Sequence, residues 1–304
     1  MGRRYDHISF LSDYGLQDEF VGVVHSVIAD LAPHARVIDL THGVAPFDVR
    51  AGSLALARSI GYVPSGVIIA VVDPGVGSDR RGVAIEVLGG DGVLVGPDNG
   101  LLAPAVALAG GAGRVVELTS ADHRLPSPGA TFDGRDVFAP AAAHLCNGVD
   151  LAELGDLIDP DLLTPGVVAL PQADDEQVIA QVLWCDRFGN AQLNVGPDDL
   201  PASFGDRLSV RISAPTDPTG GTTRVVQRAT SFADVVGGSV GLLVDSSGLL
   251  AIVMNQRSAR DELDLDVGDQ VTITAVSSEA SDGGDPVAVA QPVDLSRRPS
   301  SGDR

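Results

Sequence analysis

The chain has 304 residues and a formal net charge of −21, because 41 Asp and Glu outnumber 20 Lys and Arg. This acidity argues against nucleic acid or an anionic membrane as a partner, since both are polyanions. A hydrophobic fraction of 44% is typical of globular proteins. The length favours two domains over a single core.

The first half of the chain alternates between strand-like and helix-like segments. Short apolar runs at 8–11, 37–40 and 67–72 predict strands, and apolar residues at helical spacing over 19–31 and 51–60 predict helices between them. The run at 67–72 is unbroken, as expected for a strand buried on both faces of a parallel sheet. The rhythm predicts an α/β domain with a doubly wound, mainly parallel sheet. Further strands are expected at 83–87 and 93–96, and helices at 101–109 and 138–146.

The second half has a different rhythm, with short apolar runs separated by Gly, Pro and Asp turns. It predicts a smaller antiparallel β domain that resembles a barrel. We expect an N-terminal α/β domain at 1–165, a linker at 166–177, the β domain at 178–276 and a disordered tail at 277–304. The strands of the second domain are expected at 178–185, 192–195, 207–212, 223–226, 239–244, 249–253 and 270–276.

The start of the chain and its cysteines show no sign of export. No long apolar stretch follows Arg4, and nowhere does the sequence approach the ~20 apolar residues of a membrane span. Cys146 and Cys185 lie in apolar contexts without CxxC spacing, which indicates buried, inert thiols. We therefore expect a cytoplasmic protein.

The densest polar segment follows the strand predicted at 67–72. Asp73 stands at its carboxyl end, where sites of doubly wound sheets are found, as do Asp13 and Asp98 at the ends of their own strands. Gly75 and Gly77 permit a tight turn that presents Asp73 to a cleft. Arg80 lies seven residues beyond Asp73 and can fold back to pair with a carboxylate. The alternative is an acidic turn without catalytic consequence.

Two further clusters suggest a site. Asp133 precedes a glycine beside an aromatic residue, whereas Arg135 and Asp136 at the start of a helix fit a structural ion pair equally well. Asp186 and Asn190 flank a turn after the first strand of the second domain, and the turn alone can explain them.

The histidines give no metal pattern along the sequence. His25 and His144 lie on predicted helices and fit packing roles, while His42 follows a strand and is the only histidine in a cleft position. No two have the spacing of metal ligands, so we predict no metal. No Walker, GxGxxG, HExxH or GxSxG motif occurs in a supporting context.

Six segments taken together are specific for a family. The chain resembles the S-adenosyl-L-methionine (SAM) hydroxide adenosyltransferases, also called SAM hydrolases, which are relatives of fluorinase and chlorinase. The resemblance extends from about Ile8 to Val276 and is carried by Phe10–Gly15, Thr41–Val49, Val72–Gly77, Gly96–Leu101, Thr131–Asp136 and Asp186–Asn190.

The resemblance implies a reaction and an assembly. Family members attack C5′ of SAM with water-derived hydroxide and release adenosine and L-methionine, without a cofactor. They are homotrimers with the site between the N-terminal domain of one subunit and the C-terminal domain of the next. It also implies roles in substrate binding: Asp13 for the ribose, Phe47 in the sugar pocket, Asn190 with the backbone from Met254 to Gln256 for adenine, Phe232 stacked on adenine, and Asp186 and Ser246 for methionine.

By the same resemblance Asp73, Arg80 and Asp133 would act on the water. The hydrolases share an Asp-Arg-His set, and Asp133 stands where they have the histidine. A non-catalytic binder of SAM or adenosine is the first alternative, motivated by this difference. A halogenase is a weaker one, because Asp73 replaces a tyrosine of fluorinase and Gly134 replaces its halide-binding serine.

Overall fold

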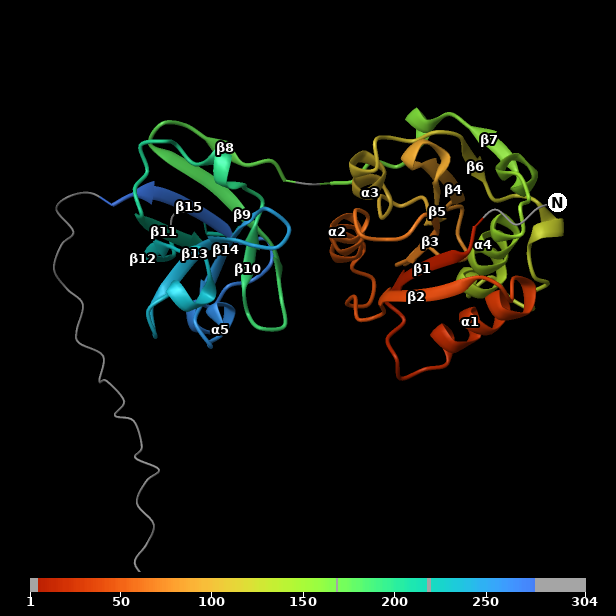
Figure 1. The fold of residues 1–304 in the computed structure, drawn as a ribbon, viewed down its shortest axis with the longest axis horizontal. Helices are drawn as coiled ribbons and strands as arrows, with labels where there is room; N and C mark the ends of the chain where they lie inside the picture. Colours follow the sequence, from red (N-terminus) through yellow and green to blue (C-terminus); the bar gives the residue numbers. More distant parts are fainter. Residues whose placement is uncertain (1–4, 168, 218–219, 277–304) are drawn as a thin grey trace, which may run out of the picture. The chain divides into compact units, whose positions relative to one another are not determined.

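The computed structural model describes residues 5–167, 169–217 and 220–276, and it divides into two compact units, Met1–Val168 and Ala169–Arg304. The tail predicted at 277–304 lies outside the described residues. The first unit holds a seven-stranded sheet in the order β2-β1-β3-β5-β4-β6-β7 (Figure 1). Its strands are β1 (His7–Ser12), β2 (Arg36–Thr41), β3 (Gly66–Val71), β4 (Gly82–Val87), β5 (Gly92–Pro97), β6 (Val115–Glu117) and β7 (Asp156–Ile158).

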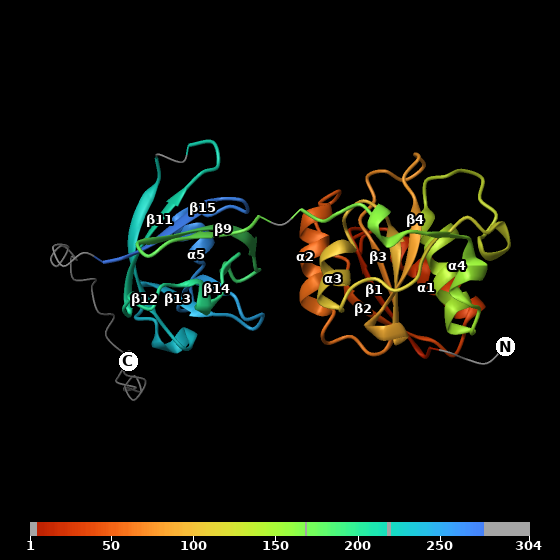
Figure 2. The same cartoon turned by 90° about the horizontal axis from the view of Figure 1, so that it is seen from above.

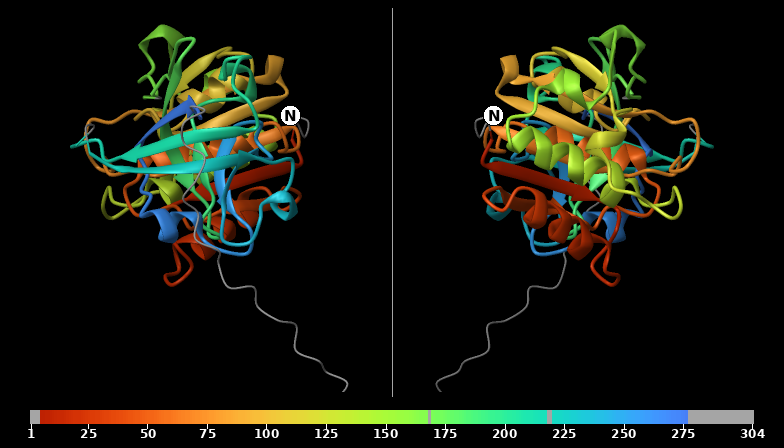
Figure 3. Two further views of the ribbon diagram at one scale, coloured as in Figure 1. Left: turned by 90° about the vertical axis from the view of Figure 1, so that its left-hand side faces the viewer. Right: turned by 90° about the vertical axis from the view of Figure 1, so that its right-hand side faces the viewer.

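Helices cover both faces of this sheet, as a doubly wound fold requires (Figure 2). One face carries α2 (Val49–Ser59) and α3 (Ala103–Leu108), and the other carries α1 (Phe20–Leu31) and α4 (Ala139–Cys146). Figure 3 (right) shows α4 in front of the strands. Since β2, β1, β3 and β5 pair in parallel while β4, β6 and β7 pair antiparallel, the predicted mainly parallel sheet is confirmed with an antiparallel edge.

The sequence explains why the central elements form. All six residues of β3 are buried, so its unbroken apolar run is matched by helices on both sides. In α1, Val21, Val24 and Ile28 are buried at helical spacing. The helix α2 begins at an N-cap, because the Asp48 side chain accepts a hydrogen bond of 2.8 Å from the Ala51 amide.

The second unit is a β-barrel with a mixed sheet, whose strands are labelled in Figure 1. The order β10-β14-β13-β12-β11-β15-β9 closes because β9 also pairs with β10, and a short β8 extends the sheet beyond β9. The predicted barrel is confirmed, with one difference: β12 and β13 are parallel. The elements are β8 (Gln172–Ala173), β9 (Gln177–Cys185), β10 (Ala191–Leu193), β11 (Arg207–Ser213), β12 (Thr222–Arg228), β13 (Val240–Val244), β14 (Leu250–Met254), α5 (Ala259–Leu263) and β15 (Gln270–Ala275).

Short helices complete the description. Gly134–Phe138 is a π-helix that leads directly into α4. No helix among the described residues has the length and apolar character needed to cross a membrane. The 3₁₀ helices lie at Leu88–Gly90, Ala121–His123, Leu151–Leu154, Pro160–Leu162, Pro197–Asp199 and Phe232–Asp234.

Candidate active site

A buried ion-pair cluster forms just beyond the carboxyl end of β3. Arg80 Nε donates to Asp73 Oδ1 at 3.0 Å, and Arg80 Nη2 donates to Asp73 Oδ2 in the second arm of a fork. The side chains are only 9% and 6% exposed, respectively. The predicted return of Arg80 over the glycine turn is therefore confirmed.

The turn that brings these residues together needs its second glycine. Gly77 has a φ of 78°, in the left-handed region, and a Cβ there would lie 2.5 Å from the Ala130 carbonyl oxygen. Gly75 has no such constraint, since its nearest neighbours would be in ordinary contact at 3.4 Å. Gly77 thus lets the β3–β4 turn lie against the segment that precedes Asp133.

Asp133 joins the cluster from the start of the π-helix. Arg80 Nη2 donates to Asp133 Oδ2 at 2.7 Å, so one guanidinium nitrogen bridges two carboxylates. Arg135 does not compete, because its Nε and Nη2 donate to Asp136 at 2.6 and 2.9 Å. This pair is the structural one considered from the sequence. The three residues predicted to act on water therefore lie together.

Burial and charge act in opposite directions on Asp73. Burial raises the pKa of its carboxyl group most strongly, Arg80 lowers it, and the negative charge of Asp133 raises it again, for a net upward shift. The Arg80 guanidinium packs over the face of the Phe138 ring, with 5.6 Å between the guanidinium carbon and the ring centroid. The cluster therefore combines a carboxyl group of raised pKa with a guanidinium that is held in place.

Tyr14 is a neighbour of the cluster that the sequence did not single out. Its ring packs edge-on against Phe10 and Phe132, and burial, followed by the charges of Asp13, Asp73 and Asp133, raises its pKa. The phenol therefore stays protonated. A Cβ at Gly134 would lie 2.3 Å from the Tyr14 hydroxyl oxygen, so Gly134 makes the space that this hydroxyl occupies.

Asp13 and Phe47 meet beside the end of β1. The Asp13 amide donates to the Val71 carbonyl at 3.2 Å, which holds it next to the end of β3. Its Oδ2 accepts a hydrogen bond of 2.9 Å from the Phe47 amide. Phe47 has a φ of 68° and a side chain that is 72% exposed, so its ring is presented to solvent from a strained backbone.

In the second unit, most of the predicted binding residues gather at one end of the barrel. Asp186 Oδ1 accepts from the Asn190 amide at 2.9 Å and Oδ2 accepts from Asn190 Nδ2 at 2.8 Å, so the two side chains brace their own turn. Met254 ends β14 opposite Val240, and Gln256 follows with a φ of 56°.

Phe232 comes before β13 in the chain and Ser246 comes after it. Ser246 is exposed in the turn between β13 and β14, at the opposite end of that hairpin from Met254. Phe232 begins a 3₁₀ helix before β13 and is 49% exposed. Asp245, the residue before Ser246, accepts a hydrogen bond from Gln192 Nε2, two residues beyond Asn190. The Val235 carbonyl, three residues beyond Phe232, accepts a hydrogen bond of 3.3 Å from Asn255 Nδ2.

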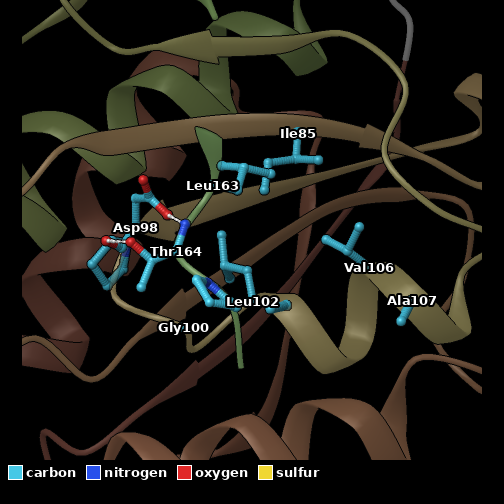
Figure 4. A pocket seen from close by; sticks show the side chains of 11 residues that line it. Ile85, Asp98, Gly100, Leu102, Val106, Ala107, Leu163 and Thr164 are labelled. Atoms are coloured by element: carbon cyan, nitrogen blue, oxygen red, sulfur yellow. Dashed lines mark hydrogen bonds between the residues drawn. The ribbon is translucent and has the colours of Figure 1, made fainter. Parts of the chain in front are cut away.

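The third strand-end carboxylate, Asp98, has a structural partner. Arg81 Nη2 donates to Asp98 Oδ2. The Thr164 amide donates to Asp98 Oδ1 at 2.8 Å (Figure 4). Beside it is a hollow of about 170 Å³, lined mainly by apolar side chains such as Leu102, Val106 and Leu163. Asp98 itself lines this hollow, but none of the residues expected to bind substrate or to act on water does.

Sequence spacing also missed a cluster in which two histidines contact one aspartate. His25 Nε2 and His42 Nε2 lie 2.8 and 3.0 Å from the same oxygen of Asp39. The three residues come from α1, β2 and the residue just after β2, so no motif in the sequence marks them.

A doubly wound unit with acidic and basic side chains gathered at the carboxyl ends of its strands is a common setting for a site that takes a small molecule. The chain matches the family models of the SAM hydroxide adenosyltransferase N-terminal domain over residues 8–155 and of its C-terminal domain over residues 180–272. It belongs to this family.

Its relatives include hydrolases and, more distantly, halogenases. The (R)-S-adenosyl-L-methionine hydrolase of Salinispora arenicola is 44% identical over 271 residues, which cover 88% of this chain and 97% of the relative. A fluorinase of an Actinoplanes species is 25% identical, with 88% and 97% covered. The crystal structure of an uncharacterized conserved protein from Thermotoga maritima is 35% identical, with a TM-score of 0.79 and coverage of 88% and 99%.

Proposed function

We propose that this enzyme hydrolyses S-adenosyl-L-methionine to adenosine and L-methionine. Water adds to C5′ as the C5′–S bond breaks, the sulfur keeps the bonding electron pair, and the water gives up one proton. The identity of 44% to a relative named for this activity supports the proposal. The observation that carries it is the buried contact of Arg80 with both Asp73 and Asp133, because these groups can activate water.

The chemistry of the substrate explains why such a cluster suffices. The leaving group is a neutral thioether, so no acid has to protonate it. The nucleophile is the difficulty, since bulk water has a pKa of about 15.7. A water beside Arg80 would be a better nucleophile, because the cation favours the hydroxide form. Positioning it in line with the C5′–S bond contributes up to about 7–11 kcal/mol in the best cases.

The two carboxylates divide the remaining work. Burial and Asp133 raise the pKa of Asp73, so this carboxylate can accept a proton more readily than an exposed one. Asp133 neutralises part of the Arg80 charge through its hydrogen bond of 2.7 Å, and it offers a second acceptor to the water. We propose Asp73 as the main proton acceptor and Asp133 as the residue that orients the water, in place of the family's histidine.

The test is hydrolysis in water enriched in ¹⁸O. We expect adenosine and methionine in equal amounts, with the label in the 5′-hydroxyl of adenosine, because water attacks carbon. Both sulfonium epimers should be assayed, since the relative is named for the (R) form. Binding of adenosine without product formation would leave a non-catalytic binder, and the hydrolase proposal would fail.

Asp73→Asn tests the cluster directly. We expect turnover to fall about 10²–10⁴-fold, the usual contribution of a general base, with little change in adenosine affinity. Asp98→Asn is the matched control, because it also removes a carboxylate paired with an arginine at a strand end. Equal losses in the two variants would remove the proposed role of Asp73.

The halogenase alternative has less support. A serine at position 134 would place its Cβ 2.3 Å from the Tyr14 hydroxyl, so the chain has no space there for a halide-binding serine. We expect no 5′-halo-5′-deoxyadenosine when chloride or fluoride is added to the reaction. Formation of such a product would reverse this conclusion.

We also propose a homotrimer in which the two units of different subunits share each substrate, with Asp13, Phe47 and the Asp73 cluster on one side. Asp186, Asn190, Phe232, Ser246, and the backbone from Met254 to Gln256 would then bind substrate from the other. Mixing Asp73→Asn chains with Asn190→Ala chains under conditions of subunit exchange should restore part of the activity. If subunits exchange but no activity is recovered, each site must lie within one chain.

A cytoplasmic location stays a prediction.

A further inference from the structure

His25, Asp39 and His42 form a cluster on the surface edge of the first unit, separate from the Asp73–Arg80–Asp133 contacts. Each offers one ligand atom, and these atoms all lie within 4.8 Å of one another. His25 projects from α1, Asp39 lies on β2 and His42 follows β2, so three positions that are distant in sequence converge through the fold.

The contacts around His42 leave one ring nitrogen without a satisfactory partner. The His42 side chain is only 3% exposed, and its Nδ1 lies 2.7 Å from the Ser12 hydroxyl oxygen. Its Nε2 lies 3.0 Å from Asp39 Oδ1, yet among the described residues no hydrogen bond of acceptable geometry satisfies this buried atom. A buried polar atom without such a bond is costly.

Neither tautomer of His42 removes the problem. If Nδ1 carries the hydrogen and donates it to Ser12, the lone pair of Nε2 has no donor, and the nearest polar atom is a carboxylate oxygen at 3.0 Å. If Nε2 carries the hydrogen, its direction forms no hydrogen bond with Asp39. Asp39 Oδ1 already receives His25 Nε2 at 2.8 Å. A cation between these atoms would satisfy all three.

We propose that His25 Nε2, His42 Nε2 and the Asp39 carboxylate bind one divalent transition-metal ion of the Zn²⁺ type. Two imidazoles and one carboxylate are a donor set that zinc and its neighbours accept, with water in the remaining position. Ligands about 2.1 Å from a tetrahedral ion lie about 3.4 Å apart. The separations of the three ligand atoms, 2.8 and 3.0 Å to Asp39 and at most 4.8 Å overall, need only small adjustments.

The surroundings already hold the ligands in place. The Ser12 hydroxyl fixes the second nitrogen of His42, as outer hydrogen bonds do for metal-binding histidines. The Phe10 ring packs edge-on against the His42 ring at 4.6 Å between centroids.

The ion would fasten α1 to β2 and to the loop that carries Asp13. The Gly15 amide donates to the His42 carbonyl at 2.8 Å, and Ser12 precedes Asp13 directly. The site is therefore structural: it positions the loop at the end of β1 and does not touch the reacting atoms.

The experiment titrates the metal-stripped full chain with Zn²⁺ by calorimetry and with Co²⁺ by its visible absorbance. We expect one ion per chain and a Co²⁺ spectrum with nitrogen and oxygen ligands. His25→Ala, on a partly exposed helix face, should weaken binding more than about 10-fold while the variant stays folded. Ser12→Ala should cost about 10–100-fold, the usual effect of an outer hydrogen bond.

His7→Ala is the matched control, because it removes a histidine outside the cluster. It should bind Zn²⁺ as the parent chain does. Unchanged binding by His25→Ala together with Asp39→Asn, or absence of saturable binding by the parent chain, would overturn the proposal. Since binding is read without substrate, this result is independent of whether the enzyme hydrolyses SAM.

Discussion

Two opposite effects act on the pKa of Asp73. Its burial favours the protonated form, while the neighbouring Arg80 favours the ionised form, and the net pKa lies above the ordinary value of 3.8. If the ionised carboxylate accepts the proton from water, activity must fall as the pH drops through this raised pKa. The acidic limb of the rate profile should therefore lie above the range of an exposed aspartate.

The same shift has a consequence for stability with its own sign. A carboxyl group whose pKa is raised on folding contributes stability at acidic pH, and this contribution is lost as pH rises from the unfolded pKa through the folded pKa. Asp73→Asn should therefore not lower the melting temperature at neutral pH, although it removes the acidic limb of the rate profile. A large drop in melting temperature would mean that the ionised pair with Arg80 stabilises the fold.

Gly134 and Tyr14 make a second prediction at the scale of residues. A methyl group at position 134 would collide with the Tyr14 hydroxyl at 2.3 Å, and overpacking of this kind costs about 1–3 kcal/mol. Gly134→Ala should lower the free energy of unfolding by that amount and reduce turnover. Adding Tyr14→Phe removes the hydroxyl and should restore most of the stability. Denaturant unfolding measures the free energy of unfolding of the single and the double variant. If Tyr14→Phe restores no stability, the clash does not involve the Tyr14 hydroxyl.

Among single residues, the sequence predicted those that stand at strand ends and missed those that meet through tertiary contacts. Asp73 and Arg80 share one turn, so their pairing could be inferred from spacing. His25 and Asp39 lie on a helix and a strand whose side-by-side packing no local pattern reveals. The position of the Tyr14 hydroxyl likewise depends on space left by Gly134, which is far along the chain.

At the scale of elements, the β3–β4 turn is the most constrained connection near the cluster. Gly77→Ala would place a side chain in the left-handed region, at a cost of about 1–2 kcal/mol, and would press against the Ala130 carbonyl. We expect the turn to shift. Turnover should then fall by more than the loss of folded protein can explain. Gly75→Ala is the control, since Gly75 has no positive φ and its Cβ would make ordinary contact at 3.4 Å. Equal turnover in both variants would show that the turn adapts.

The elements that sequence patterns missed are the short or unusual ones. β6 and β7 have three residues each, too few for a period of two to be visible. The parallel pairing of β12 with β13 depends on a connection that crosses rather than turns back. The helix predicted at 138–146 begins in fact with a π-helix from Gly134, because its first turn accommodates an extra residue.

At the scale of the whole molecule, the protein has a net charge of −21, whereas SAM carries a positive sulfonium. An acidic protein attracts such a cation, and salt screens this attraction, since the Debye length falls from about 10 Å at 0.1 M to about 3 Å at 1 M. The KM for SAM should therefore rise with ionic strength. Inhibition by neutral adenosine is the internal control and should change little; a parallel change would indicate an effect of salt on the fold.

The two-domain organisation was accessible from the sequence because the two halves bury their apolar residues differently. Long helical periods mark the first half, and short runs between glycine and proline turns mark the second. Each unit has its own core: Phe10, Ile69 and Phe138 contribute to one, and Val182, Val210 and Ile252 to the other.

Arg80 and Arg81 are adjacent in the chain, but their side chains bind different groups. Arg80 binds the Asp73 cluster, whereas Arg81 donates to Asp98 and to the Leu162 carbonyl, at the segment through which the chain leaves the first unit. One peptide unit thus ties the reactive cluster to the departing chain. A substitution that shifts this turn should therefore speed proteolytic cleavage at residues 162–165 and slow product formation. The two rates should change together.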